Sequence, residues 1–261
     1  MELGLKDKLI VVSGGCAGIG AAIARACLAE GAQVAVLARP SKNVDAFMAE
    51  MQATSARCTL IETHLEDTGQ CEHAIRVIEE RHGDIFGLVN NAGVNDRIGL
   101  ELGSIEQFIE SLHKNLIHYY ALAHCALGSL KRTQGSIVNI SSKVALTGQG
   151  GTSGYAAAKG AQLALTREWA AELAAYGIRV NAVLPAEVMT PLYQRLLDAT
   201  ADPDGSLRQI TRKIPLGHRM TLDSEIASAT VFLLSPVQSG HTTGQHFVVD
   251  GGYVHLDRAL T

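Results

Sequence analysis

The chain has 261 residues, of which 47% are hydrophobic and 18% are charged, with a formal net charge of −4 at pH 7. This globular composition can bury a sizeable core, and the lack of a basic run argues against a nucleic-acid or anionic-membrane surface. Five cysteines without a Cys-x-x-Cys pair, no apolar run of about 18 residues and no signal-peptide layout predict a cytoplasmic protein without a disulfide framework or a membrane span.

Short apolar runs alternate with longer segments of helical periodicity along the whole chain. The runs expected to form strands are Leu9–Ser13, Gln33–Ala38, Arg57–Glu62, Ile85–Asn90, Ser136–Ser141, Arg179–Leu184 and His246–Val249. Their continuous apolar character suits strands covered on both faces. Helices expected between them include Gly18–Glu30, Cys71–His82, Ile105–Leu127 and Ala156–Tyr176. This alternation predicts one α/β domain over residues 1–261, a Rossmann-type doubly wound parallel sheet of about seven strands with helices on both faces.

A glycine-rich turn follows the first expected strand and leads directly into a helix, with the sequence Ser13-Gly14-Gly15-Cys16-Ala17-Gly18-Ile19-Gly20. Glycines let the backbone approach a pyrophosphate closely, and the first N–H groups of the next helix face its charge. In this position the pattern predicts a dinucleotide cofactor. The residues expected to contact it are Gly14, Cys16, Ala17, Gly18 and Ile19.

The end of the second expected strand bears on the choice between NAD and NADP. A carboxylate there would bind a free ribose 2′-hydroxyl, whereas an arginine can pair with a 2′-phosphate. The strand ends Leu37-Ala38-Arg39-Pro40, without a carboxylate. The sequence therefore favours NADP over NAD, and the alternative is that Arg39 is a solvated surface charge.

Tyr155 and Lys159 are four residues apart at the start of an expected helix, so their side chains share one face. An ammonium beside a phenol stabilises the phenolate and lowers its pKa from the usual value of about 10. Ser142 follows the fifth expected strand, thirteen residues before Tyr155. Strand ends and helix starts converge on ligands in such sheets. The pattern predicts Tyr155 as a general base that Lys159 activates.

The most irregular stretch is Pro185 to Pro215, which follows the sixth expected strand. Ligands of open α/β sheets lie beyond the carboxyl ends of the strands, so we expect residues 185–215 to form a substrate lid. An inert insertion is the alternative.

Several motifs together resemble the short-chain dehydrogenase/reductase family over essentially the whole chain. They are Ser13-Gly14-x-x-x-Gly18-x-Gly20, Asn90-Asn91-Ala92-Gly93, Asn139-Ile140-Ser141-Ser142, Tyr155-x-x-x-Lys159 and the turn from Pro185 to Thr190. The resemblance implies an NAD(P)-dependent oxidoreductase acting on a CH–OH group, and commonly a homotetramer built on the expected helices 105–127 and 156–176. It implies further cofactor contacts from Leu65, Asn91, Ala92, Gly93, Tyr155, Lys159, Pro185, Val188 and Thr190.

The same resemblance implies a catalytic set of Asn115, Ser142, Tyr155 and Lys159. Tyr155 takes the proton of the substrate hydroxyl while Ser142 binds the same oxygen. Lys159 lowers the pKa of Tyr155 and binds the nicotinamide ribose, and Asn115 holds a water that links Lys159 to solvent. For Asn115, the alternative is a helix-interior polar residue bonded to the backbone.

Segments outside this set resemble a bacterial L-fucose dehydrogenase subgroup. They are 115–120, 147–150, 152–155, 185–191 and 251–258. The resemblance implies oxidation of C1 of an aldose, L-fucose or the related L-galactose and D-arabinose, to the lactone. We expect Asn95, Gln149 and Glu187, together with Ser142 and Tyr155, to bind the sugar hydroxyls. Solvated or capping loop residues are the alternative for Asn95, Gln149 and Glu187.

Other functions remain open from the sequence. They are a carbonyl reductase or hydroxysteroid-type enzyme, another sugar dehydrogenase such as an L-rhamnose 1-dehydrogenase, and a cofactor-sensing protein without catalysis. Only 5% of the residues are aromatic, which favours a polar sugar site, and the complete catalytic set argues against the sensor. No metal site is expected, because His241 and His246 lack a third ligand. The segment 253–260 either reaches a neighbouring subunit or packs within its own chain.

Overall fold

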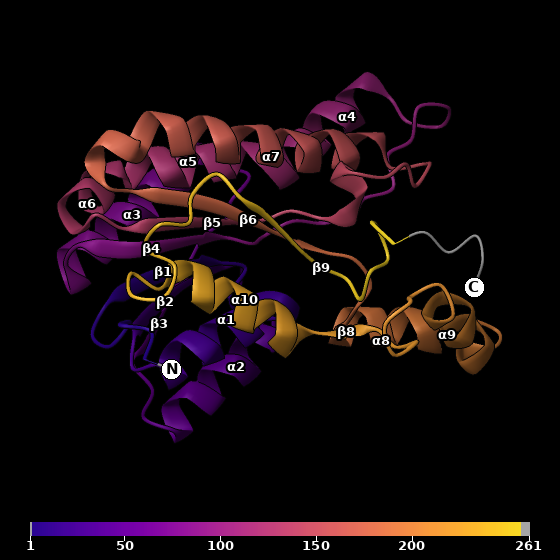
Figure 1. Ribbon diagram of the computed structural model, residues 1–261, viewed down its shortest axis with the longest axis horizontal. Coiled ribbons are helices and arrows are strands. Elements are labelled where there is room, and N and C mark those ends of the chain that lie inside the picture. Colours follow the sequence, from indigo (N-terminus) through magenta and orange to yellow (C-terminus); the bar gives the residue numbers. More distant parts are fainter. Residues whose placement is uncertain (1, 257–261) are drawn as a thin grey trace.

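The computed structural model describes residues 2–256. In this part of the chain, seven parallel strands form one sheet in the order β3-β2-β1-β4-β5-β6-β9 (Figure 1). The strands are β1 (Leu9–Ser13), β2 (Gln33–Ala38), β3 (Cys58–Glu62), β4 (Ile85–Asn90), β5 (Ser136–Ile140), β6 (Arg179–Pro185) and β9 (His246–Val249). The prediction of a seven-stranded, doubly wound α/β domain is confirmed, and the expected strand ends differ from these by one residue at most.

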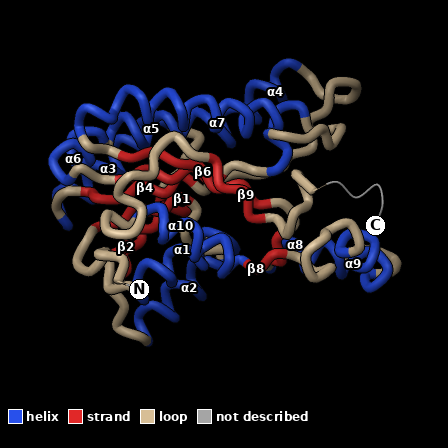
Figure 2. Tube along the Cα trace, in the orientation of Figure 1, coloured by secondary structure: helices blue, strands red, loops and turns tan. Residues whose placement is uncertain are grey.

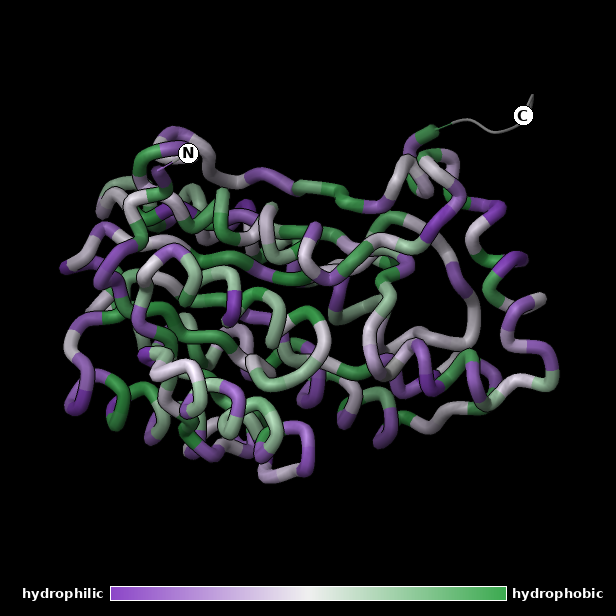
Figure 3. The backbone as a smooth tube through the Cα atoms, turned by 90° about the horizontal axis from the view of Figure 1, so that it is seen from below, coloured by the Kyte–Doolittle hydropathy of each residue, from purple (hydrophilic) through white to green (hydrophobic). Residues whose placement is uncertain are grey.

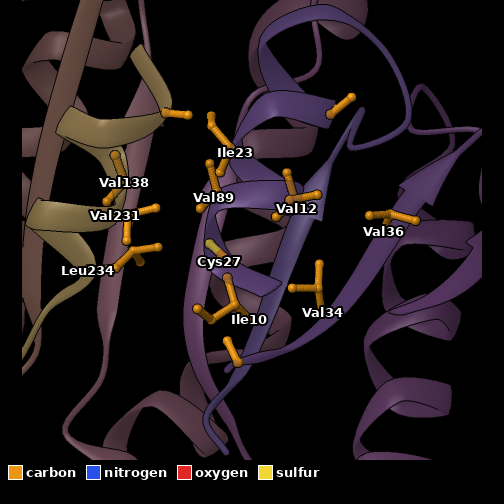
Figure 4. Close-up of a cluster of buried hydrophobic side chains, with 14 of the residues drawn as sticks. Ile10, Val12, Ile23, Cys27, Val34, Val36, Val89, Val138, Val231 and Leu234 are labelled. Atoms are coloured by element: carbon orange, nitrogen blue, oxygen red, sulfur yellow. The ribbon is translucent and has the colours of Figure 1, made fainter. Parts of the chain in front are cut away.

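Helices cover both faces of the sheet, as Figures 1 and 2 show. One face carries α1 (Gly18–Ala29), α2 (Lys42–Ala53) and α10 (Asp223–Leu234), and the other carries α3 (Thr68–His82), α5 (His118–Cys125), α6 (Leu127–Thr133) and α7 (Ser153–Leu173). Alternate residues of a strand point to opposite faces, so Ile10 and Val12 of β1 pack toward α1 (Figure 4) whereas Leu9 and Val11 pack toward α3 and α5. In Figure 3 the segments in the interior of the molecule are mainly green, which marks hydrophobic residues.

The expected helix Ile105–Leu127 is not continuous. A capping box of Ser104 and Gln107 starts α4 (Ile105–Leu112), and a π-helical turn, η1 (His113–Ile117), then separates α4 from α5. A π turn contains wider hydrogen-bonded rings than an α-helix and frequently marks a functional site. Asn115 lies inside this turn and is fully buried. Periodicity did not reveal the interruption, because the apolar pattern continues across it.

Residues 185–215 are more regular than expected. The short strand β7 (Val188–Met189) pairs with β8 (Thr221–Leu222), and α8 (Pro191–Asp198) and α9 (Pro203–Thr211) lie between them in the sequence. The side chains of Thr190 and Asp202 cap these helices, and each is followed by a proline at the first helical position. The Thr-Pro and Asp-Pro pairs were therefore the sequence signal for both helices. In Figure 1, α8 and α9 lie at one end of the molecule, beyond the sheet.

Two further features bear on the predictions. Helix α7 begins at Ser153, three residues earlier than expected, which places Tyr155 in its first turn. None of the helices in residues 2–256 is long and apolar enough to cross a membrane. Residues 257–260 of the expected C-terminal segment lie outside the described residues, so the prediction that this segment reaches a neighbouring subunit stays a prediction.

Candidate active site

A groove of about 1480 Å³ runs along the carboxyl edge of the sheet. Its lining includes every residue predicted to contact a cofactor: Gly14, Cys16, Ala17, Gly18, Ile19, Arg39, Leu65, Asn91, Ala92, Gly93, Tyr155, Lys159, Pro185, Val188 and Thr190. Ser142 also lines it, whereas Asn95, Asn115, Gln149 and Glu187 do not. At this edge, Asn90 at the end of β4 lies opposite Asn139 of β5. The predicted cofactor residues therefore share one continuous surface.

The glycine turn has the shape that a pyrophosphate needs. Gly14 and Gly18 have φ angles of +65° and +50°, in the left-handed region that glycine tolerates. A Cβ on Gly20 would lie 2.2 Å from the Gly14 carbonyl oxygen, so the turn and the start of α1 are in close backbone contact. The N-terminus of α1 has no side-chain cap, which leaves its first N–H groups facing the groove for an anion.

Side chains from β1 and from the segment after β4 hold this turn. The Ser13 hydroxyl accepts hydrogen bonds from the backbone N–H groups of Asn91 at 2.9 Å and Ala92 at 3.1 Å. The Asn91 amide in turn donates to the carbonyl of Ser13 at 3.0 Å. Asn91 therefore shapes the backbone of the glycine turn as well as lining the groove. The residues present therefore fit a dinucleotide.

The carboxylate of Glu66 lies beside Arg39, although the end of the second strand carries no acidic residue. The Arg39 guanidinium is 3.2 Å from the carboxylate of Glu66, which follows β3, and both side chains line the groove. Glu66 was not predicted, because the choice of cofactor was inferred from the residues at the end of the second strand alone. The pair gives this end of the groove both a donor for a 2′-phosphate and an acceptor for a 2′-hydroxyl.

Tyr155 and Ser142 meet at the groove. They share a hydrogen bond that lowers the pKa of the Tyr155 phenol, but burial has the larger effect and raises that pKa above its ordinary value. The Lys159 amine lies 5.4 Å from the centre of the Tyr155 ring. The predicted lowering of the Tyr155 pKa by Lys159 is therefore not seen in this structure, because the spacing of the two residues reveals nothing of how deeply both are buried.

Lys159 is 3% exposed, and burial lowers the pKa of its amine to about 7. The amine donates to the Ile140 carbonyl at 2.8 Å, to the Tyr119 hydroxyl at 3.4 Å and to the Gln162 side-chain oxygen at 3.3 Å. The Tyr119 hydroxyl itself donates to the Ile140 carbonyl at 3.0 Å. Sequence reasoning missed both Tyr119 and Gln162, although Gln162 lies one helical turn after Lys159.

Asn115 joins the site through its backbone. Its side-chain oxygen accepts from the Val94 N–H at 2.7 Å, and its side-chain nitrogen donates to the Ser111 carbonyl at 3.0 Å. The Asn115 carbonyl accepts from the Gln162 side-chain nitrogen at 2.7 Å. The side chain of Asn115 is therefore committed to the local backbone, as the alternative for this residue expected, while its carbonyl is connected to Lys159 through Gln162.

On the substrate side, Glu187 lies at the foot of residues 185–215, as predicted, but both of its carboxylate oxygens have partners. One is in contact with the Lys143 amine, and the other accepts from the Tyr193 hydroxyl at 2.8 Å. The Lys143 amine also lies 4.2 Å from the centre of the Tyr253 ring. The Lys143 and Glu187 side chains are only 12% and 17% exposed. We call Lys143, Glu187 and Tyr193 the latch.

The other two predicted sugar-binding residues are exposed on loops. The Asn95 side-chain oxygen accepts from the Arg97 N–H at 3.2 Å, which is a local loop contact. Gln149 lies in the glycine-rich segment before α7. A role of these two residues in substrate binding stays a prediction.

Comparisons with known proteins agree with this geometry. A family model described as Enoyl-(Acyl carrier protein) reductase matches residues 14–254. L-fucose dehydrogenase of Rattus norvegicus is 37% identical over 246 residues, which cover 94% of this chain and 88% of that protein. The crystal structure of Cj0485 dehydrogenase has a TM-score of 0.94 and 44% identity, covering 100% of this chain and 99% of that one. Ligand-free aldohexose dehydrogenase of Thermoplasma acidophilum has a TM-score of 0.89 and 30% identity, with coverage of 100% and 99%.

Proposed function

The chain belongs to the short-chain dehydrogenase/reductase family, and we propose that it oxidises C1 of an aldose, L-fucose or the related L-galactose or D-arabinose, to the lactone with NADP⁺ as the preferred acceptor. The observation that carries this proposal is the meeting of Ser142, Tyr155 and Lys159 on a groove whose glycine turn fits a dinucleotide. The similarity to an L-fucose dehydrogenase and an aldohexose dehydrogenase supports a sugar as the substrate.

The substrate side of the site suits a polyhydroxylated molecule. In the latch, the ammonium of Lys143, the residue after Ser142, meets the carboxylate of Glu187, and Tyr193 of α8 adds a phenol. Such groups donate to and accept from sugar hydroxyls, and a site built to bind hydroxyls rejects analogues that lack them. An apolar, aromatic lining would instead favour a steroid.

The residues divide the proton chemistry as follows. Tyr155 in its phenolate form takes the proton of the C1 hydroxyl, and the Ser142 hydroxyl donates a hydrogen bond to the same substrate oxygen. When bound, the nicotinamide supplies the acceptor for the hydride. We propose that the charged form of Lys159, whose amine lies 5.4 Å from the centre of the Tyr155 ring, favours the phenolate against the effect of burial. General acid–base catalysis of this kind is worth about 10²–10⁴-fold in rate.

Absorbance of the reduced nicotinamide tests the proposal directly. The chain is assayed with NAD and with NADP against L-fucose, L-galactose, D-arabinose, L-rhamnose and a hydroxysteroid. Turnover of the first three sugars is expected. Turnover of the steroid alone would replace the proposal with the hydroxysteroid alternative, and no turnover of any aldose would reject it.

Tyr155→Phe tests the assignment of the base. It should lower kcat by at least about 10²-fold while leaving the Kd of the cofactor nearly unchanged, because the variant loses only the phenol oxygen. Tyr176→Phe, an exposed tyrosine in the turn after α7, is the matched control and should keep full activity. Retained turnover in Tyr155→Phe would remove this residue from the mechanism.

We also propose that residues 185–215 form the lid over the sugar and that the chain assembles as a homotetramer. Three side chains on α4 and α5 support the second point, since Ile105, Ile109 and Tyr120 are exposed and large, as in a surface that a second copy covers. Size-exclusion chromatography with light scattering measures the assembly.

A further inference from the structure

The side chain of Gln162 lies between the Lys159 amine and the π-helical turn. It is fully buried, and it follows Lys159 by three residues on α7, so both side chains point from the same face of the helix. Its oxygen accepts from the Lys159 amine at 3.3 Å, and its nitrogen donates to the Asn115 carbonyl at 2.7 Å. One amide therefore connects two residues of the predicted catalytic set.

The orientation of this amide follows from its partners. A carbonyl oxygen only accepts hydrogen bonds and an ammonium only donates them. The Gln162 nitrogen must therefore face Asn115, and its oxygen must face Lys159. With the amide in the opposite orientation, two donors would meet at Lys159 and two acceptors at Asn115, and both buried hydrogen bonds would be lost.

The Lys159 ammonium has three donors and three acceptors within reach. Besides Gln162, these are the Ile140 carbonyl at 2.8 Å and the Tyr119 hydroxyl at 3.4 Å. The Tyr119 hydroxyl gives its own hydrogen to Ile140, so it presents a lone pair to Lys159. Removal of the Gln162 oxygen would leave one of the three ammonium hydrogens without its acceptor.

No carboxylate takes part in this arrangement among the described residues that contact Lys159. The titratable groups that face the amine are Tyr155 from its own helix and Tyr119 and His118 from α5. Burial raises the pKa of Tyr119 well above its usual value and lowers the pKa of His118 to about 4, so both are neutral near pH 7. The buried charge on Lys159 is therefore held by neutral dipoles, of which Gln162 is the one from a side-chain amide.

We propose that Gln162 is a positioning residue. Its amide bridges the Asn115 carbonyl and the Lys159 amine, and this bridge keeps the amine charged beside Tyr155. The amide joins these two groups directly, whereas the predicted role of Asn115 was to hold a water that links Lys159 to solvent. The inference rests on the proposed function where it concerns turnover, but the state of Lys159 is measurable without any substrate.

The first test is an NMR titration of Lys159 in the full chain with ¹³C-labelled lysine, in which Lys159→Arg identifies the signal. Gln162→Met keeps the length of the side chain but removes its amide. We expect the proton affinity of Lys159 to fall about tenfold, one pH unit in its midpoint, because the charged form loses an acceptor. A change of less than about twofold would overturn the proposal.

Gln162→Glu is the second variant, and it keeps the proposal testable if Gln162→Met folds poorly. A carboxylate oxygen still accepts from Lys159 and adds an opposite charge, so the titration midpoint of Lys159 should equal or exceed that of the wild type. A midpoint that falls as in Gln162→Met would show that the acceptor plays no part. Thr230→Val is the control, because it removes a buried hydroxyl that bonds only within α10. Circular dichroism establishes that each variant is folded.

The second test is the pH profile of kcat/KM for the best aldose. A less charged Lys159 stabilises the Tyr155 phenolate less, so the acid limb should move upward by about one pH unit in Gln162→Met. At pH 7 the rate should fall about tenfold, and on the alkaline plateau it should stay within about twofold of the wild type. A uniform loss at every pH would mean a structural role and reject the proposal. If the wild type oxidises no aldose, the proposed function fails, while the NMR titration still decides the role of Gln162.

Discussion

The glycine turn and the segment 185–215 lie at the two sides of one groove and are held in different ways. In the turn, the Ser13 hydroxyl accepts from the backbone N–H of Asn91 and the Asn91 amide donates to the Ser13 carbonyl, and there is no space for a Cβ at Gly20. The segment 185–215 is held by a ladder of two residue pairs between β7 and β8 and by the latch. A rigid backbone suits the binding of one cofactor in a fixed position. The sugar side must admit substrate and release product, and contacts between a few side chains can open for that purpose.

The largest effect is expected where the backbone has no room. In Gly20→Ala the new Cβ would lie 2.2 Å from the Gly14 carbonyl oxygen and 2.5 Å from the Asn91 side-chain nitrogen, so the turn must move. We expect the Kd of NADP to rise at least about 100-fold, equivalent to about 2.7 kcal/mol, as measured by NADPH fluorescence. Gly128→Ala is the control, because its Cβ would meet only the end of the Arg132 side chain, at 3.4 Å. An unchanged Kd in Gly20→Ala would show that the turn is not rigid.

This contrast also explains which parts were predictable from the sequence. The cofactor side depends on local patterns, a glycine turn between a strand and a helix and an Asn-Asn-Ala-Gly turn after another strand, and all of its predicted residues line the groove. The latch joins Lys143 to Glu187, 44 residues later, through side-chain conformations that no local pattern encodes. For the same reason the sequence did not predict the contact between Gln162 of α7 and Asn115 of η1, which are 47 residues apart.

The sequence predicted that Tyr155 and Lys159 lie together, but it did not predict the direction in which the pKa of Tyr155 shifts. The spacing of Tyr155 and Lys159 correctly indicated that they lie on one helix face. It carried no measure of burial, which raises the pKa of the phenol and lowers that of the amine. Both shifts disfavour the charged forms that the mechanism needs, so hydrogen bonds from Ser142 and to Gln162 gain importance.

A smaller effect, confined to the sugar side, is expected from the latch. Lys143→Met leaves the Glu187 carboxylate with the Tyr193 hydroxyl as its one side-chain partner among residues 2–256, and Glu187→Gln removes the charge opposite Lys143. Each should lower kcat/KM for the aldose about 10–30-fold, equivalent to about 1.4–2 kcal/mol, with the Kd of NADP within about threefold of the wild type.

Two further variants make the latch test decisive. The double variant should cost less than the sum of the single ones, because each single change already breaks the same contact. Asp84→Asn breaks the exposed pair with Arg132, away from the groove, and should have no effect on turnover. Equal losses of sugar turnover and cofactor affinity in Lys143→Met would contradict the separation of the two sides.

The smallest effect is expected at Arg39, at the exposed end of the cofactor side, where a side chain and not the backbone is expected to contact the cofactor. The Arg39 side chain is 64% exposed, so its pairing with a 2′-phosphate is screened by solvent. Arg39→Ala should raise the Kd of NADP about fivefold at low salt and less at high salt, without changing the Kd of NAD.

Glu66→Gln releases Arg39 from its carboxylate partner, so it should tighten NADP binding slightly and weaken NAD binding. Both Kd values come from fluorescence titrations of the reduced cofactors at two salt concentrations. If Arg39→Ala weakened NAD and NADP equally, Arg39 would stack on a part that both cofactors share, and the preference for NADP would lose its basis.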